Sequence, residues 1–491
     1  MIVRTRIAPS PTGFAHIGTI YQVMFDYAYA RKHGGQFLVR IEDTDRARFV
    51  EGAEEVVLNA MSWFGLEEDE SPRKGGPFAP YRQSERLAIY QRHARELVEN
   101  GHAFYCFCSK ERLEEMRKKQ EENKEPPRYD GRCSYLGKEE VEKRLDRGES
   151  HVIRMKIPEH ETVIVKDELL GEVSFESDTL DMQVLLKADG FPTYHLAVVI
   201  DDYLMHVTHI FRGREWLPST PKHVLLYQYF GWELPKFVHL PIILNAQGPG
   251  KLSKRNGYAS VQYYIDGGFL PEAILNYLSL IVWKHPEGKE IYGLDEFVKN
   301  FEIKDVTSQG PKFDLAKLTW LNGQWIRQLS EEDLSQRLCG TTGGKVYTEC
   351  NLDQVKLFLP LVRERISRLS DFDDLVYFLM VDSVLDVVKK DFPEVVELES
   401  KWRELMQGTK LSENDVRKIV AKVVSDLELR FEDLHGIEAS LREWFAAECY
   451  KLGDAFMVVR VALTGRTATP PLWEIVRVLG REKTLARLKL V

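Results

Sequence analysis

The chain begins with a pattern of apolar and polar residues that predicts a parallel α/β sheet. Residues 2–8 (IVRTRIA) are typical of a short strand, and the PSPTG that follows is turn sequence. Apolar side chains then recur with helical spacing from Gly18 to Lys32, and residues 36–43 return to a strand pattern. A strand, a helix and a second strand in this order are the start of a parallel sheet covered by helices.

A second α/β stretch follows much later in the chain. It has a strand at 206–213, a helix at 221–232 and a strand at 237–244. The long segment between the two stretches should fold as an inserted subdomain. Within it, residues 110–128 carry seven Lys or Arg and six Glu, which indicates a solvated helix and a connecting loop.

Beyond about residue 325 the pattern becomes helical. Ser412 is placed to cap a helix that continues to Leu427. Its apolar stripe consists of Val416, Ile419, Val420, Val423, Val424 and Leu427, and a further stripe consists of Leu441, Trp444, Phe445 and Leu452. Stripes of this spacing form helix cores and carry no chemistry themselves.

Length and composition narrow the class of protein. A chain of 491 residues is long enough for several folding units, and its 44% apolar and 29% charged residues are ordinary for a globular protein. It has no apolar run near the roughly 20 residues that cross a bilayer. Because MIVRTRIAPSPTG lacks the layout of a signal peptide, we expect a cytoplasmic protein. The net charge of -9 decides nothing about nucleic acid, since a local basic surface makes such a contact.

The turn after the first strand is the first candidate for chemistry. His16-Ile17-Gly18-Thr19 leads into the predicted helix, and the N-terminus of a helix attracts phosphate. Gly18 leaves room for a nucleotide against the backbone, and His16 can donate to phosphate oxygens. Taken alone, such a tetrapeptide is more often a proline-rich turn with a surface histidine.

A second candidate is the KLSKR sequence at residues 251–255, after the segment NAQGPG. Lys251 and Lys254 on a mobile loop can close over a triphosphate and stabilise the charge on departing pyrophosphate. Basic loops alone are usually just solvated. A phosphate-binding turn early in an α/β domain and a Lys-x-Ser-Lys loop after its second half nevertheless form a paired signature of a nucleotide site.

Cysteine usage points to a metal rather than to disulfides. Six cysteines are too few for a disulfide scaffold in a chain of this length. Two thiolates one residue apart, Cys106 and Cys108, and a distant third, Cys133, can occupy three corners of a tetrahedral zinc site. Three free and inert cysteines are the alternative.

The motifs resemble those of a known enzyme family. His16–Thr19 resembles the HIGH motif of class I aminoacyl-tRNA synthetases, and residues 251–255 resemble their KMSKS loop. Longer strings are similar to bacterial glutamyl-tRNA synthetases, namely RIAPSPTG, LVRIEDTD (38–45), APYRQSER (79–86), FPTYHLAVVIDD (191–202), RGREWL (212–217) and LTGRTATPPLWEIVRVLG (463–480). The resemblance therefore spans essentially the whole chain.

Four positions depart from the family's pattern. Thr19 replaces the last His of the HIGH motif, and the loop has Leu252 for Met and Arg255 for the final Ser. Similar variants occur within the family, so the implied chemistry is unchanged. Arg214 stands where an acidic residue is usual, and its role stays open.

The resemblance implies the fold and its division. We expect an α/β Rossmann-like catalytic domain with a parallel sheet, an inserted acceptor-binding subdomain, a helical stem-contact region and an all-α C-terminal anticodon-binding region. Residues 1–105 and 191–248 would form the two halves of the catalytic domain, 106–190 the acceptor-stem-binding insertion, 249–325 the KLSKR loop and stem-contact domain, and 326–491 the anticodon-binding region.

The resemblance also implies the reaction and its partners. A monomeric glutamate–tRNA ligase would activate L-glutamate with Mg²⁺-ATP to glutamyl-adenylate and transfer it to the terminal ribose 2′-OH of tRNA(Glu). No side-chain nucleophile is required, so catalysis would come from positioning and charge stabilisation. Pro9, His16, Gly18, Thr19, Lys251, Ser253 and Lys254 match the ATP site, and of these His16, Thr19, Lys251 and Lys254 match catalytic residues.

The matching glutamate pocket needs cations, because glutamate carries two carboxylates. Arg6 matches the arginine that pairs with the side-chain carboxylate, and a bidentate fork there would select a carboxylate over an amide. Arg212 matches a second pocket arginine, and Glu42 matches the acid that receives the α-amino group. Ser10 and Tyr194 match further substrate contacts.

The resemblance extends to one structural Zn²⁺ at the cysteine cluster. Several family members hold zinc there, with a tyrosine four residues before the last Cys or a histidine two residues after it as the fourth ligand. The second of these positions is Tyr135, so Tyr129 is the candidate. The predicted ligands are thus Cys106, Cys108, Tyr129 and Cys133.

The tail is expected to read the anticodon. Arg363 and Arg365 lie near the place where discriminating family members sense the last anticodon base, although plain charge on a helix surface explains either arginine as well. Whether tRNA(Gln) is also charged stays open.

Other classes of protein agree less well with the sequence. Glutaminyl-tRNA synthetases end in β-barrels, against the helical stripes, and the truncated relatives that glutamylate a tRNA base lack the tail. A nicotinamide dehydrogenase would need G-x-G-x-x-G after the first strand, and none follows it. A non-catalytic tRNA-binding paralogue would have lost the lysine loop or the pocket arginines, and both are present.

Overall fold

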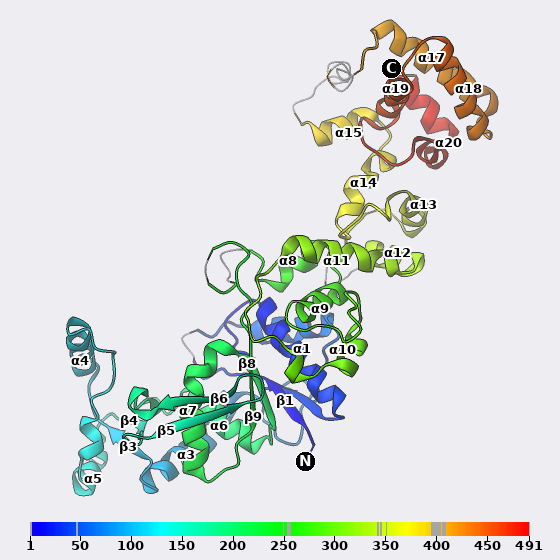
Figure 1. Cartoon of the computed structure of the whole chain (residues 1–491). Coiled ribbons are helices and arrows are strands. Elements are labelled where there is room, and N and C mark those ends of the chain that lie inside the picture. Colours follow the sequence, from blue (N-terminus) through cyan, green and yellow to red (C-terminus); the bar gives the residue numbers. More distant parts are fainter. Residues whose placement is uncertain are drawn as a thin grey trace. The chain divides into compact units, whose positions relative to one another are not determined.

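The protein forms two compact units. The computed structural model describes residues 2–45, 48–248, 250–252, 257–340, 343, 346–349, 351–393, 404 and 409–490. One unit consists of Met1–Tyr264 and Pro271–Leu315, and the other of Ile265–Leu270 and Ala316–Val491 (Figure 1). Among the described helices, none is long and apolar enough to cross a membrane.

The first unit alternates strands and helices. In chain order its elements are β1 (Arg4–Ile7), α1 (Ile17–Lys32), β2 (Gln36–Val39), α2 (Ala53–Trp63), α3 (Leu87–Glu99), β3 (Ala103–Cys106), α4 (Lys110–Glu122), α5 (Lys138–Asp146), β4 (Val152–Met155), β5 (Thr162–Asp167), β6 (Gly171–Glu176), β7 (Val184–Leu186), α6 (Tyr194–Leu204), β8 (His209–Gly213), α7 (Thr220–Phe230), β9 (Lys236–Leu240), α8 (Val261–Asp266), α9 (Pro271–Leu280) and α10 (Leu294–Asn300).

The central strands run parallel, as predicted. β1 pairs with β2, and β8 pairs with β9, both in parallel. The N–H of Thr208, just before β8, donates to the carbonyl of Arg4 in β1 at 2.9 Å, so the two pairs meet side by side. The inserted segment adds the antiparallel hairpin β5–β6, and β5 joins β9 at Asp167. Strands β3, β4 and β7 form a separate antiparallel sheet.

Helices cover the sheet with the side chains that the sequence pattern selected. Ile20, Val23 and Met24 of α1 are completely buried. On α6, five consecutive apolar residues from Leu196 to Ile200 enter the same core as Val224 to Tyr227 of α7. This apolar packing is what fixes the ends of β1 and β8, where the candidate chemistry lies.

Several strands are shorter than the sequence predicted. The strand expected at 206–213 begins only at His209, because His206 adopts a left-handed turn (φ 54°) after α6. The strand expected at 237–244 ends at Leu240, before Pro241, which has no N–H for a ladder. The helix expected to reach residue 232 ends at Phe230, and Gly231 caps it in the left-handed region.

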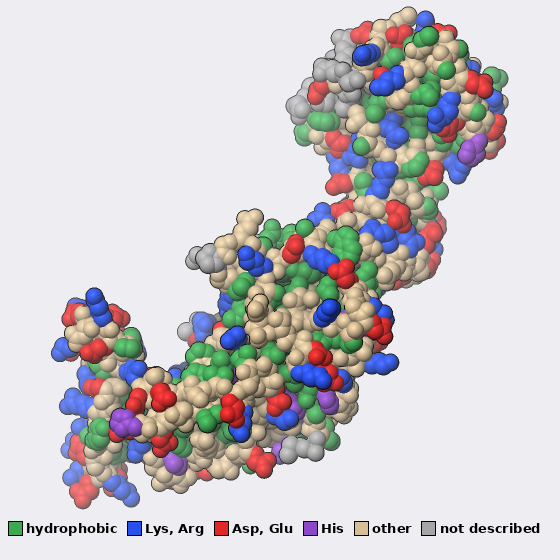
Figure 2. Space-filling model, in the orientation of Figure 1, with side chains coloured by type: hydrophobic (Ala, Val, Ile, Leu, Met, Phe, Trp, Pro, Cys, Tyr) green, Lys and Arg blue, Asp and Glu red, His purple; other side chains and the backbone are tan. Residues whose placement is uncertain are grey.

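The charged helix of the insertion is confirmed. α4 and the neighbouring α5 contain no buried residue. Figure 2 shows Lys and Arg interspersed with Asp and Glu over these two helices, at the end of the insertion remote from β1. Such a mixture is the expected surface of solvated helices.

The second unit is helical throughout its described residues. Its elements are α11 (Leu315–Gln328), α12 (Glu331–Cys339), α13 (Leu352–Val362), α14 (Asp371–Met380), α15 (Val384–Asp391), α17 (Glu413–Arg430), α18 (Leu434–Ala447), α19 (Leu452–Thr464) and α20 (Leu472–Leu488).

The predicted cap of α17 is confirmed, and one predicted stripe is partly wrong. Ser412 forms a reciprocal capping box with Asp415. The second stripe holds as far as Phe445, but α18 ends at Ala447 because the chain turns through Cys449 at positive φ. Leu452 therefore opens the next helix, 37% exposed, and does not extend the stripe.

Candidate active site

α1 begins at the candidate phosphate-binding turn. His16 is the N-cap of α1, and its Nδ1 accepts the backbone N–H of Gly18 at 2.9 Å. Because Nδ1 holds a lone pair, the proton of the neutral imidazole is on Nε2, where it can be donated. A Cβ on residue 18 would lie 3.0 Å from His16 Nδ1, so glycine is what allows this arrangement.

The segment after the KLSKR loop is hydrogen-bonded to this turn, and Lys251 at the start of the loop lines the same pocket as His16. Lys251 forms a bridge with Leu244, and beyond the loop the carbonyl of Ala259 accepts the N–H of Ile17 at 2.8 Å. Lys251 Nζ lies 3.4 Å from Glu215 Oε1. Ser253, Lys254 and Arg255 lie outside the described residues. The structure thus joins the two motifs of the paired signature in one place.

A pocket of about 270 Å³ lies at this junction. It is lined by His16, Gly18, Thr19, Tyr21, Gln22, Gly213, Glu215, Trp216, Leu240, Pro241, Ile242, Ile243, Lys251 and Leu252. Pro9 is not among these residues, and its carbonyl instead accepts the N–H of Glu42 at 3.0 Å. Sequence reasoning gave no role to Glu215 and Trp216, whose only signal was the string RGREWL.

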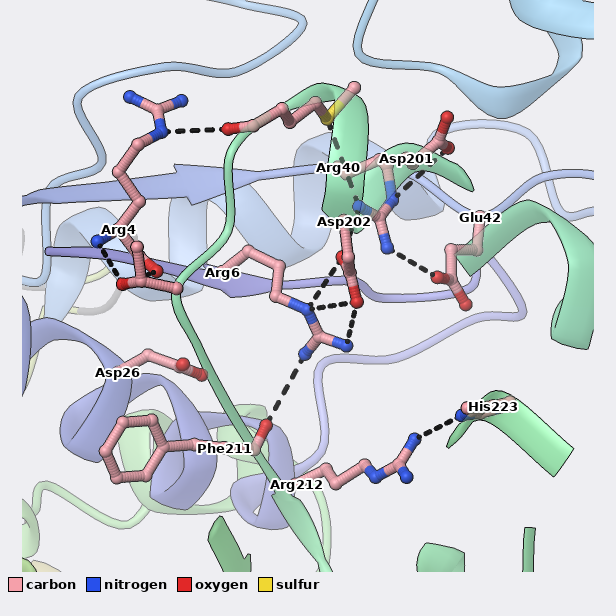
Figure 3. A network of polar contacts seen from close by, with 12 residues as sticks. Arg4, Arg6, Asp26, Arg40, Glu42, Asp201, Asp202, Phe211, Arg212 and His223 are labelled. Carbon is pink, nitrogen blue, oxygen red and sulfur yellow. Dashed lines mark hydrogen bonds and ion pairs between the residues drawn. The ribbon is translucent and has the colours of Figure 1, made fainter. Parts of the chain in front are cut away.

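Next to the pocket, a buried network surrounds Arg6 (Figure 3). Arg6 is 2% exposed, and its Nε lies 3.1 Å from Asp202 Oδ1. Arg40 shares that carboxylate, with Nη1 2.7 Å from Asp202 Oδ1. Burial would raise the pKa of Asp202, but Arg6 and Arg40 beside it lower it overall. The predicted glutamate-side arginine therefore already has an anionic partner within the fold.

Glu42 occupies the other end of the same network. Its Oε1 lies 3.2 Å from Arg40 Nη2, and the residue is 8% exposed. Burial raises the pKa of Glu42 to about 7, although Arg40 and Arg6 oppose the shift. This carboxyl group can therefore gain or lose a proton near neutral pH.

Arg212, in β8, is held only by neutral groups. Its Nε donates to His239 Nε2 at 3.0 Å, and its Nη2 donates to Thr220 Oγ1 at 2.7 Å. Nη1 lies 3.2 Å from His223 Nδ1 (Figure 3). It also lies 3.5 Å from Tyr194 Oη. Arg212 is 3% exposed, and within the described part of the chain no carboxylate forms an ion pair with it. Burial lowers its pKa, as expected of an uncompensated buried cation.

Tyr194 connects this cluster with the nucleotide pocket. Its ring lies 4.6 Å, centroid to centroid, from that of Trp216, which lines the pocket. Arg212 is followed directly by Gly213, another lining residue. Ser10, the remaining candidate of the glutamate site, is exposed in the turn after β1. The buried cation of Arg212 is thus one residue along the chain from a residue that lines the pocket.

The cysteine cluster assembles in the inserted segment. The Sγ atoms of Cys106, Cys108 and Cys133 lie within 4.8 Å of one another. Tyr129 Oη lies 3.4 Å from Cys108 Sγ and accepts the N–H of Cys133 at 3.0 Å. A hydrogen bond from Cys133 lowers the pKa of Cys106 to about 4, which favours its thiolate form. The donor set suits a four-ligand metal site, although burial raises the pKa of the Tyr129 phenol.

The two candidate anticodon arginines differ in their surroundings. Arg363 Nη2 donates to the carbonyl of Arg327 at 3.0 Å and also to that of Leu329, so it caps the end of α11. Arg365 is exposed. Burial and, secondly, the charge of Arg365 lower the pKa of Arg460, so these two arginines lie near one another.

Comparisons with known proteins agree with this architecture. A family model described as "tRNA synthetases class I (E and Q), catalytic domain" matches residues 2–320, and one described as "Anticodon binding domain" matches residues 320–491. A glutamate–tRNA ligase of Pseudomonas savastanoi is 44% identical over 488 residues, which is 99% of this chain and 94% of that protein. One of Acinetobacter baumannii is 43% identical over 490 residues, which is 100% of this chain and 93% of that protein.

Solved structures show the same likeness. The glutamate–tRNA ligase of Elizabethkingia meningosepticum, solved in complex with its amino acid, superimposes with a TM-score of 0.81 at 32% identity, covering 100% of this chain and 99% of that one. The glutamate–tRNA synthetase of Elizabethkingia anophelis gives a TM-score of 0.80 at 32% identity, with the same coverage.

The chain therefore belongs to the class I tRNA synthetase family for glutamate and glutamine (E and Q). Within that family its full-length curated relatives are glutamate–tRNA ligases. The expected fold class, an α/β catalytic domain with a parallel sheet and an all-helical anticodon region, is confirmed.

Proposed function

We propose that the protein is a glutamate–tRNA ligase that activates L-glutamate with ATP and esterifies it to tRNA(Glu). The α-carboxylate of glutamate attacks the α-phosphate of ATP, which forms glutamyl-adenylate and releases pyrophosphate. The terminal ribose 2′-OH of tRNA then attacks the adenylate carbonyl, which releases AMP. Full-length identity of 43–44% to glutamate–tRNA ligases supports this function.

The geometry of the nucleotide pocket supports the first step. We assign the triphosphate to the N-terminus of α1, where the helix dipole is positive and where the capping residue His16 lines the pocket together with Gly18 and Thr19. Lys251, with Ser253 and Lys254 of the loop, would stabilise charge on the departing pyrophosphate. ATP enters as its Mg²⁺ complex. Glu215 is the one carboxylate among the described lining residues, and Mg²⁺ commonly combines few carboxylates with substrate phosphates.

The observation that carries the amino acid assignment is Arg212. A buried guanidinium with neutral partners gains most from an incoming carboxylate, because the pair forms where water is excluded. We assign a glutamate carboxylate to Arg212 and Tyr194, with Arg6 behind them as a second positive charge. Glu42 receives the α-ammonium group, and Pro9 and Ser10 lie on the turn after β1, where the carbonyl of Pro9 accepts the N–H of Glu42.

We assign tRNA to the remaining regions. Residues 106–190 would contact the acceptor stem, 249–325 the stem below it, and 326–491 the anticodon. Of the two candidate arginines, Arg365 is the better reader of a base, because it is exposed, whereas Arg363 is engaged by backbone carbonyls.

We further propose one structural Zn²⁺ held by Cys106, Cys108, Tyr129 and Cys133. When bound, the ion would tie the loop that ends at Cys133 to β3. Three converging sulfurs and a phenol oxygen fit the donor set of such a site. Purified protein never exposed to chelator should hold about one zinc per chain, and Cys108→Ser should release it while adenylate formation survives. Metal-free protein with full charging activity would contradict the assignment.

The function is tested by ATP-dependent glutamylation of purified tRNA(Glu) and tRNA(Gln), compared side by side. We expect the enzyme to esterify the amino acid glutamate, and not the amino acid glutamine, to tRNA(Glu). Charging of both tRNAs would identify a non-discriminating enzyme. Binding of tRNA without any glutamate-dependent turnover would contradict the proposal and indicate a non-catalytic paralogue.

A further inference from the structure

Two imidazoles hold the guanidinium of Arg212. Arg212 Nε meets His239 Nε2 at 3.0 Å, and Nη1 meets His223 Nδ1 at 3.2 Å. A guanidinium can only donate, so both ring nitrogens must carry lone pairs. Each imidazole is therefore neutral, with its proton on the opposite nitrogen. Burial lowers the pKa of both histidines, in agreement with this requirement.

A carboxylate fixes the proton of His239 on the required nitrogen. Asp167 Oδ2 accepts the Nδ1 proton of His239 at 2.7 Å and its backbone N–H at 3.0 Å. Its other oxygen accepts the N–H groups of Leu169 and Leu170 at 2.9 and 2.8 Å. The side chains of Asp167 and His239 are both completely buried. The carboxylate of Asp167 accepts from four donors, one of which is His239 Nδ1. The proton of the neutral imidazole is therefore on Nδ1.

Asp167 does not come from the two halves that form the pocket. It ends β5, in the segment inserted between them, and reaches His239 because β5 pairs with β9 at this residue. This side chain brings the inserted segment into contact with His239, a hydrogen-bond partner of Arg212.

We propose that Asp167 and His239 are positioning residues for amino acid recognition: Asp167 sets the tautomer of His239, and His239 sets the orientation of the Arg212 guanidinium toward the substrate carboxylate. The inference rests on the proposed assignment of Arg212 to the glutamate pocket. The opposite tautomer would aim an imidazole N–H at the N–H of Arg212, and the guanidinium would rotate away. Orienting carboxylates act on histidine in this way in other kinds of site.

The first test is Asp167→Asn, measured by glutamate-dependent ATP–pyrophosphate exchange in the presence of tRNA. The amide of asparagine has one acceptor oxygen in place of two, so it no longer holds the imidazole proton on Nδ1 as the carboxylate does. We expect the KM for glutamate to rise on the order of tenfold, while the KM for ATP changes by less than about twofold. The matched control is Asp178→Asn, which alters an exposed Asp–His pair with His160 in the same inserted segment and should change neither value.

A double-mutant cycle separates positioning from support of the fold. Gln at position 239 has no tautomers, so Asp167→Asn should change the glutamate KM by less than about twofold in a His239→Gln background. An unchanged glutamate KM in folded Asp167→Asn, or an effect that persists undiminished in that background, would overturn the proposal.

If Asp167→Asn does not fold, His239→Gln and His239→Leu decide the matter. Gln keeps an acceptor for Arg212 and should have the lower glutamate KM, and equal values would overturn the proposal. Failure of the assigned function itself looks different, because the unmodified protein would then show no glutamate-dependent exchange at all.

Discussion

Arg6 and Arg212 are both buried in the catalytic unit, yet the groups around them differ in charge. Arg6 faces Asp202 at 3.1 Å, and Arg40 shares the same carboxylate at 2.7 Å. Among the described residues, Arg212 donates its side-chain hydrogen bonds to imidazole and hydroxyl groups and forms no ion pair. The first cluster balances its charges within the chain, whereas the second leaves a buried positive charge for something else to balance.

The difference assigns the two arginines separate roles. Breaking a buried ion pair is costly because it leaves a charge without compensation, so Arg6 and Asp202 contribute to the fold whether or not substrate is bound. A buried cation with neutral partners contributes little to the stability of the fold. Its charge contributes most when a ligand carboxylate binds beside it. Both arginines were predicted as glutamate contacts, and the geometry favours Arg212 as the one available to a carboxylate.

The largest expected effect is on stability and follows from Asp202→Asn. The substitution removes the anion shared by Arg6 and Arg40 and should lower the free energy of unfolding by about 3–5 kcal/mol. Urea denaturation of the purified variant measures it, with the exposed Asp178→Asn as a control that should change little. A loss for Asp202→Asn no larger than for the control would show that the two arginines do not depend on this carboxylate.

The same pair shows what sequence alone can predict. Apolar periodicity identified β1, α1 and α17, because a buried helix face or strand repeats at a fixed local spacing. Asp202 lay inside the recognised string FPTYHLAVVIDD but received no role, because its partner Arg6 is 196 positions away. No local pattern encodes a contact over that separation.

The limits of sequence-based prediction in the second unit have the same physical origin. Arg363 looked like a surface charge or a base reader, whereas the fold uses it to satisfy carbonyls at the end of α11. In the first unit, two strands were predicted too long because the left-handed turn at His206 delays β8 and Pro241 ends β9. The cysteine cluster was predictable, since its residue types and spacing limit the chemistry before folding is considered.

Arg212→Met should affect glutamate binding more than stability, in contrast to Asp202→Asn. We expect the KM for glutamate to rise on the order of a hundredfold, because a carboxylate loses its charged partner where water is excluded. The substitution should lower the free energy of unfolding by less than about 2 kcal/mol, because it breaks no ion pair. Arg6→Met is the matched variant, with a smaller rise in glutamate KM and a larger loss of stability. If Arg6→Met impairs glutamate binding more than Arg212→Met, the roles assigned to the two arginines are exchanged.

The smallest expected effect is a pH dependence set by Glu42, a buried carboxyl group of the Arg6 network. Burial raises its pKa from 4.5 to about 7, so the group is mostly ionised at pH 8 and mostly protonated at pH 6. Only the carboxylate pairs with the α-ammonium of glutamate, so the KM for glutamate should rise about tenfold as the pH falls across this range. Burial keeps the pKa of His223 and His239 below its ordinary value, so protonation of these two histidines does not account for such a pH dependence.

Protonation of Glu42 should weaken glutamate binding but stabilise the folded state. Because the folded pKa of Glu42 exceeds its ordinary value of 4.5, the folded state binds more protons than the unfolded state between that pH and about 7. The contribution of Glu42 to stability therefore falls as the pH rises through this window, while glutamate binding improves. Glu42→Gln should abolish both dependences and raise the KM for glutamate at pH 8. The test is to measure the glutamate KM from pH 6 to 8 in the unmodified protein and in Glu42→Gln. Identical pH profiles would show that Glu42 is not part of the amino acid site.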